Sequence, residues 1–166
     1  MQYPEPHLWI DNRRVERTAS GNLIPVINPG DGAVLGSLPA AGAKELEAAV
    51  SAAGQGFRLW SNAAPLERFR ILSKATALIR ERCESIAQIL TLEQGEPLAE
   101  ARREVSLSAD IIEFLAEEGK RLGGREVPPR MPTIRSQTVR RVPVGPVAAF
   151  TPCFSATAAR MRWRGH

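Results

Sequence analysis

Histidine and cysteine are both scarce in this chain, with two of each among 166 residues. His7 and His166 lie in terminal segments that we expect to be solvated, so the sequence predicts neither a histidine-centred triad nor a metal site. Cys83 and Cys153 lie far apart, with neither zinc-site spacing nor the dense pattern of a disulfide-rich secreted domain. The cysteine content therefore favours a reducing, cytoplasmic setting.

Long apolar runs and nucleotide-binding signatures are also missing. No stretch reaches the roughly 18 uncharged apolar residues that a membrane span needs, and the first residues lack the pattern of a secretory signal. The chain contains no G-x-G-x-x-G, no Walker loop and no Cys-x-x-Cys. The missing apolar run argues against membrane insertion, and the missing signal pattern argues against export.

Charge is nearly balanced over most of the chain, although 22 basic and 18 acidic side chains leave a net charge of +4. Arg160, Arg162 and Arg164 stand in a final segment without acids, and removing them leaves 19 basic side chains against 18 acidic. This tail, with Trp163 as a stacking platform, is a candidate nucleic-acid binder. We do not expect such binding, because three arginines neutralise too few phosphates for tight binding at physiological salt.

The first forty residues have the pattern of two β-hairpins. Residues 8–10 and 13–15 flank Asp11-Asn12, a pair that tolerates the left-handed conformation of a tight turn. Residues 23–27 end at a dense turn cluster over 28–32, after which an apolar run resumes. Packing is the expected role of both hairpins.

From Lys44 the apolar period changes to that of a helix. Apolar stripes predict three helices, over 44–60, over 65–90 and over 98–115. Cys83 falls on the second stripe, so we interpret it as a small hydrophobic core residue. The carboxylates along the helices are interleaved with arginines at helical spacing, which is typical of a solvated face. These carboxylates include Glu93, Glu96, Glu100, Glu104 and Glu113.

After a proline-rich bend at 128–132, the branched and charged residues of 133–142 predict an exposed or edge strand. Residues 147–150 form an apolar run that predicts a strand buried on both faces, followed by a turn at Thr151-Pro152. In doubly wound α/β proteins a cofactor lies at the carboxyl ends of such strands.

Several ordered blocks of sequence together resemble one family. The blocks are Ile10-Asp11-Asn12, Val26-Ile27-Asn28-Pro29, Trp60-Ser61 with Arg68, Thr91-Leu92-Glu93-Gln94-Gly95 with Pro97, and Pro143-Val144-Gly145-Pro146-Val147 leading to Thr151-Pro152. This order resembles the N-terminal part of NAD(P)-dependent aldehyde dehydrogenases, most of all the succinate-semialdehyde dehydrogenase branch. The resemblance covers about residues 7–152, nearly the whole chain.

The resemblance implies an α/β fold in which β-hairpins and amphipathic helices pack on a nicotinamide-binding domain. Residues 133–142 would form a protruding oligomerisation strand, and 147–150 the first strand, and the only one encoded, of the parallel sheet. A partial cofactor-binding domain would then span 1–152 and a divergent basic tail 153–166. Phe150, Thr151 and Pro152 would supply one wall of the crevice for NAD or NADP.

The resemblance also implies a reaction, the oxidation of an aldehyde to a carboxylic acid. A cysteine thiolate attacks the aldehyde, hydride passes to the nicotinamide, and a glutamate activates the water that releases the acid. In the family, Trp-Asn-Phe-Pro follows the Thr-Pro turn and its asparagine donates to the oxyanion. Here Cys153-Phe154-Ser155 follow, so that donor is absent, and the later nucleophile and base blocks have no counterpart.

We therefore expect a truncated piece of such an enzyme that has no catalytic residue of its own and is inactive alone. An alternative from another functional class is a non-catalytic interaction module, whose strand at 133–142 pairs with a full-length relative by strand addition. Both hypotheses allow a homo-oligomer or a full-length aldehyde dehydrogenase subunit as partner.

Overall fold

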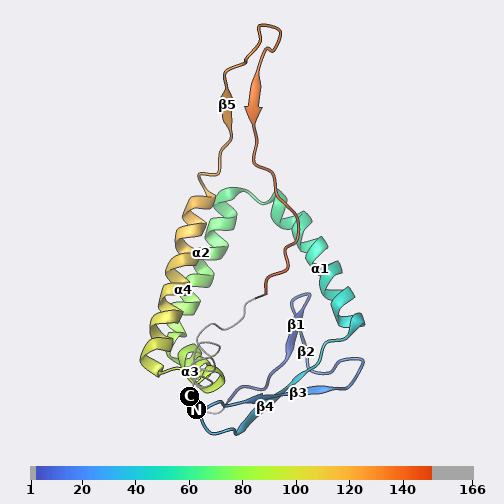
Figure 1. Ribbon diagram of the computed structural model, residues 1–166, viewed down its shortest axis with the longest axis vertical. Helices are drawn as coiled ribbons and strands as arrows, with labels where there is room; N and C mark the ends of the chain where they lie inside the picture. Colours follow the sequence, from blue (N-terminus) through green and yellow to red (C-terminus); the bar gives the residue numbers. More distant parts are fainter. Residues whose placement is uncertain (1–2, 151–166) are drawn as a thin grey trace, which may run out of the picture.

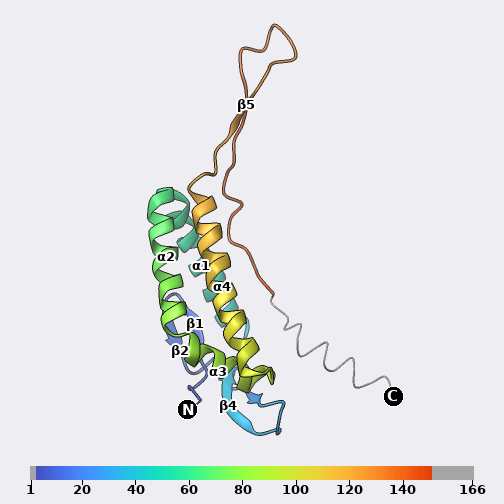
Figure 2. The same ribbon diagram turned by 90° about the vertical axis from the view of Figure 1, so that its left-hand side faces the viewer.

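The computed structural model describes residues 3–150 of the chain. Along this part, two β-hairpins are followed by four α-helices and a third hairpin, and each hairpin is its own antiparallel sheet (Figure 1). Helices α2 and α4 lie side by side along one side of an open frame, and α1 slants along the other (Figures 1 and 2). The first two hairpins close the base of the frame.

The two N-terminal hairpins confirm the prediction from turn residues. Strands β1 (Leu8–Ile10) and β2 (Arg13–Val15) pair around Asp11 and Asn12, whose φ angles of 52° and 57° are left-handed. Strands β3 (Leu23–Ile27) and β4 (Val34–Pro39) pair with a register shift between Val26 and Ile27. That bulge precedes the turn cluster at 28–32, where Gly32 has a φ of 75°.

The helices are α1 (Ala43–Asn62), α2 (Pro65–Glu81), α3 (Cys83–Gln94) and α4 (Leu98–Gly119). The prediction of one helix over 65–90 is wrong, because the chain breaks at Arg82, whose φ and ψ of −98° and 12° are not helical. The backbone N–H of Arg82 still bonds to the carbonyl oxygen of Leu78. The apolar spacing continues through the break, so periodicity alone could not reveal it.

Small side chains form the core where α4 packs on α2 and α3. The buried apolar residues are Ala87, Ala101, Val105, Ala109 and Ala116. The half-buried apolar residues packed against the first three of these are Ile79, Cys83, Ile86, Leu90 and Leu98. On α4 the stripe differs from the predicted one at its end, since Ala116 is buried whereas Leu115 is 60% exposed.

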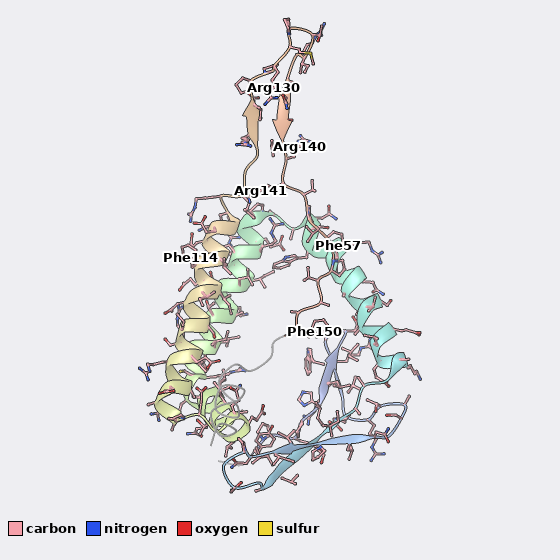
Figure 3. The ribbon with its side chains drawn as sticks, viewed as in Figure 1. Phe57, Phe114, Arg130, Arg140, Arg141 and Phe150 are labelled. Atoms are coloured by element: carbon pink, nitrogen blue, oxygen red, sulfur yellow. The ribbon has the colours of Figure 1, made fainter. Side chains whose placement is uncertain are left out.

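Large apolar side chains lie on the opposite, outward face of α4. Leu107, Ile111 and Phe114 are each about half exposed or more, and Figure 3 shows Phe114 on the outer side of the helix. The accessible surface of the chain is 13455 Å², against about 8,000 Å² for a compact monomer of this mass. A helix that is apolar on two faces is typical of an element packed on both sides.

The third hairpin projects as an arm from the end of the frame that lies opposite the first two hairpins (Figure 1). Its strands β5 (Arg125–Val127) and β6 (Gln137–Val139) are antiparallel, with Arg125 opposite Val139. The predicted strand over 133–142 is therefore shorter than expected, and its partner β5 was not predicted. Prolines at 128, 129 and 132 lack the N–H of a ladder and occupy the tip instead.

The expected strand at 147–150 is not formed in the described part of the chain. These residues lie at the end of a segment that runs down from the arm and, in the turned view, away from the helices (Figures 1 and 2). Val147 is 76% exposed, which contradicts burial on both faces. A strand requires a hydrogen-bonding neighbour, and no described segment pairs with this one.

Candidate functional site

The expected cofactor-binding turn begins at Phe150, the last described residue. Its side chain is 91% exposed, and Figure 3 labels it at the end of the segment that descends from the arm. Thr151 and Pro152 lie outside the described residues, as does the tail at 153–166. Pockets that bind small cofactors bury most of the ligand between several walls. Residues 3–150 by themselves therefore do not fit a nicotinamide cofactor, and its contacts with these three residues stay a prediction.

Cys83 is the free cysteine of the described residues and begins α3. Its side chain is half-buried against the small core, and its thiol donates to the backbone carbonyl of Arg102, 3.7 Å away. Reactive cysteines lie in electropositive, accessible surroundings that stabilise the thiolate. A packed thiol that donates to a carbonyl supports its interpretation as a core residue.

Two blocks of the family pattern meet where the arm joins the frame. Trp60 and Arg68, from the end of α1 and the start of α2, line a cleft of about 400 Å³ together with Val142 to Gly145. The guanidinium of Arg68 donates to the carbonyl oxygen of Ala63 at 2.8 Å, which fixes the turn between the two helices. The cleft joins blocks that are far apart in sequence, and sequence analysis did not bring them together.

Two other blocks meet at the corner between α3 and α4. Gly95 ends α3 with a φ of 73°, and a Cβ atom there would lie only 2.9 Å from Cγ of Pro29, in the turn after β3. Two positions before Gly95, Oε1 of Glu93 accepts a hydrogen bond from the hydroxyl of Tyr3 at 2.5 Å. Burial, and then this contact with Glu93, raise the pKa of Tyr3 to about 12. At this corner the two blocks hold the turn after β3, and the N-terminal Tyr3, against the end of α3.

Several carboxylates on the helices form exposed ion pairs, and the shortest of those between helices join α2 or α3 to α4. Arg80 contacts Glu113 at 2.6 Å and Asp110 at 2.8 Å. Arg102 contacts Glu84 at 2.7 Å, and this guanidinium lowers the pKa of Glu84 to about 2. Such surface pairs stabilise a fold only weakly.

Glu96 does not belong to the solvated face that the sequence predicted for the carboxylates along the helices. Its side chain is 9% exposed, and no ion pair within the described residues reaches it. Sequence analysis missed this site, because Glu96 lies in a corner whose burial depends on how α3 and α4 pack. The signal available in the sequence was its position, because Glu96 directly precedes Pro97, the proline between the two helices.

The arm carries five exposed arginines and one acidic residue, Glu126. The arginines are Arg125, Arg130, Arg135, Arg140 and Arg141, three of which are labelled in Figure 3. None of them forms an ion pair with the described residues, in contrast to Arg80 and Arg102 on the helices. An unpaired basic arm suits contact with another molecule that carries negative charge.

Two further features follow from the described residues alone. Within 3–150, every helix is too short or too polar to cross a membrane. In the same range, no three histidine, cysteine, aspartate or glutamate side chains cluster as metal ligands would.

The sequence profile of the aldehyde dehydrogenase family matches residues 15–159. The chain belongs to this family. Over 144 residues, 87% of this chain, it is 41% identical to succinate-semialdehyde dehydrogenase [NADP(+)] GabD of Escherichia coli and 45% identical to 4-(hydroxymethyl)benzenesulfonate dehydrogenase TsaD1 of Comamonas testosteroni. The chain spans 28% and 29% of the length of these two relatives.

Solved structures show the same similarity in three dimensions. An NADP-dependent enzyme of Escherichia coli has a TM-score of 0.73 and 38% identity, over 79% of this aldehyde dehydrogenase chain and 27% of its own. Succinate-semialdehyde dehydrogenase from Burkholderia pseudomallei has a TM-score of 0.72 and 35% identity, over 76% of this chain and 26% of its own. The predicted family and its α/β fold are thus confirmed, and the described elements make up only part of that fold.

Proposed function

We propose that this chain supplies the N-terminal framework of an NAD(P)-dependent aldehyde dehydrogenase and does not oxidise aldehydes by itself. The observation that carries the proposal is the family match over residues 15–159 of a chain whose described cysteine, Cys83, is packed and hydrogen-bonded. The family reaction needs an accessible thiolate, a glutamate base and an oxyanion donor. The sequence offers no counterpart of these three groups at the family's motifs.

The substrate class of the corresponding whole enzyme is, in this proposal, an aldehyde that carries an acidic group. Succinate semialdehyde and glutarate semialdehyde appear in the names of the relatives, and both are small aldehydes with a carboxylate. The nicotinamide cofactor would accept the hydride in that enzyme. We also propose a reducing, cytoplasmic setting, in keeping with the free thiol of Cys83.

Absorbance at 340 nm tests this proposal with purified chain, succinate semialdehyde and either NAD⁺ or NADP⁺. We expect no turnover, and no saturable calorimetric isotherm for either cofactor. The Escherichia coli relative serves as the positive control for substrate and cofactor. Turnover that persists through purification and disappears in Cys83→Ser or Cys153→Ser would overturn the proposal.

A second candidate function is that of an interaction module that pairs with another copy or with a full-length aldehyde dehydrogenase. The arm favours it, because β5 and β6 form a two-stranded sheet whose outer edges have no strand neighbour among the described residues. An open sheet edge is a template for strand addition. Co-expression of the tagged chain with the Escherichia coli relative tests this function: recovery of both in one complex supports it, and separate elution contradicts it.

A further inference from the structure

The corner between α3 and α4 holds a buried carboxyl group with an unusual set of neighbours. Glu96 is 9% exposed, and its Oε1 atom is buried without a hydrogen-bond partner. Glu100 and Glu104 follow at helical spacing on α4, and the carboxyl group of Glu104 is within hydrogen-bonding reach of Glu96. Two ionised carboxylates are acceptors only, so this contact becomes a hydrogen bond only when one of them carries a proton.

The charged groups around the corner do not neutralise Glu96. On α4, Arg103 contacts Glu100 at 3.8 Å, and no basic side chain of the described residues contacts Glu96 or Glu104 within 4.0 Å. At the end of α3, the carboxylate of Glu93 accepts from the Tyr3 hydroxyl instead.

The turn between β3 and β4, which meets the corner at Gly95, contributes one titratable side chain. That side chain, Asp31, accepts from the backbone N–H of Ala33. The charged groups that act on Glu96 are the carboxylates of Glu104 and Glu100.

These surroundings favour the neutral acid. Burial raises the pKa of Glu96, and the charge of Glu104, the contact with Glu104 and the charge of Glu100 raise it further. Leaving a buried carboxylate oxygen unpaired costs free energy, as does placing two like charges together. One proton shared between the two carboxyl groups removes the repulsion between their charges.

We propose that Glu96 and Glu104 share one proton in the folded chain, and that release of this proton loosens the corner between α3 and α4. The corner is where the helices meet the β3–β4 hairpin, through the contact of Gly95 with Pro29. Deprotonation weakens that junction and makes the stability of the frame pH-dependent. This proton-sensitive contact is independent of the proposed catalytic incapacity.

The sign of the effect follows from proton linkage. A carboxyl group whose pKa is raised by folding contributes stability below the ordinary glutamate value of about 4.3. That contribution is lost as the pH rises through the raised value in the folded state. Each unit of difference between the two pKa values corresponds to about a tenfold change in the folding equilibrium.

Glu96→Gln is the variant that tests the proposal, because its amide donates a hydrogen bond to Glu104 at every pH. Unfolding of the full chain in urea, followed by circular dichroism, is compared with wild type from pH 5 to pH 8.5. We expect the variant to be more stable than wild type at pH 8.5, with a difference that shrinks toward pH 5. Glu104→Gln should give the same result, because it also leaves one neutral donor in the pair.

Glu47→Gln, an exposed position on α1, is the matched control, and its difference from wild type should not change with pH in this way. Carbon-13 NMR of the glutamate carboxyl groups, assigned by the loss of one signal in Glu96→Gln, follows the titration without unfolding. A Glu96 signal that titrates at or below about 4.3 overturns the proposal. A stability difference that is equal at pH 5 and pH 8.5 overturns it too.

Discussion

The carboxylate of Glu45 accepts a hydrogen bond from the backbone N–H of Ala19, across 2.8 Å and 26 positions in sequence. Its other oxygen accepts from the N–H of Gly42, at 2.9 Å, before the first turn of α1. Ala19 lies in the loop between the two N-terminal hairpins. One side chain thus satisfies a donor at a helix N-terminus and ties the hairpin region to α1.

Glu45→Gln should therefore destabilise the chain, because an amide offers only one acceptor atom and turns its NH₂ group toward a second N–H donor. We expect a thermal midpoint lower by about 2–4 °C, the shift that loss of a helix cap gives in a chain of this size. Glu47→Gln, exposed on the same helix, is the control and should leave the midpoint unchanged.

Acid should remove this difference. The hydrogen bonds from Ala19 and Gly42 lower the pKa of Glu45. Its contribution to stability is present above the ordinary glutamate value and is lost as the pH falls through the lowered value of the folded state. The midpoints of wild type and Glu45→Gln should converge in acid, and a constant difference down to pH 2 would contradict this role.

Gly95→Ala should also destabilise the chain, for two separate reasons. The φ of 73° at this position costs an alanine about 1–2 kcal/mol, and the new Cβ would lie 2.9 Å from Pro29. Gly54→Ala in α1 is the control, because nothing lies within 4 Å of a Cβ there. That control should be stabilised by about 0.5–1 kcal/mol, since glycine is a poor helix residue. Equal changes in the free energy of unfolding for Gly95→Ala and Gly54→Ala, measured in urea, would contradict the close contact of Gly95 with Pro29.

Local signals in the sequence were sufficient to predict those turns and helix starts that neighbouring residues determine. Asp11-Asn12 predicted the first hairpin turn, and the apolar stripe over 65–90 predicted where α2 begins. The break at Arg82 could not be predicted, because the apolar spacing continues through it and α3 packs on α4 beyond it. The burial of Glu96 also depends on how α3 and α4 pack. The run at 147–150 has the pattern of a buried strand, but a strand forms only beside a neighbour, and no described segment supplies one.

The outward face of α4 should make the chain self-associate. Leu107, Ile111 and Phe114 are exposed at helical spacing, and apolar patches of this kind are rare on soluble monomers. Phe114→Lys should lower both light scattering and the fluorescence of a hydrophobic dye. Ser106→Lys adds the same charge elsewhere on the helix and should change neither as much. A monodisperse wild-type monomer that binds no dye would show that this face is covered.

The arm offers a comparison between two adjacent glycines. A Cβ at Gly124 would overlap the carbonyl oxygen of Val139, whereas a Cβ at Gly123 meets nothing nearer than 3.9 Å. Gly124→Ala should therefore force β5 and β6 apart, and Gly123→Ala should leave them paired. The rest of the frame does not depend on this contact, so its helices should persist in both variants.

If the arm joins this chain to a second copy or to a full-length aldehyde dehydrogenase, association should be lost in Gly124→Ala and kept in Gly123→Ala. Sedimentation velocity measures the association of the chain with itself, and co-purification measures its association with the full-length enzyme. Far-ultraviolet circular dichroism checks that both variants keep the helical signal of wild type. Association that survives equally in both variants would show that the arm contributes nothing to the contact, and Phe114→Lys would then test whether the outward face of α4 carries it.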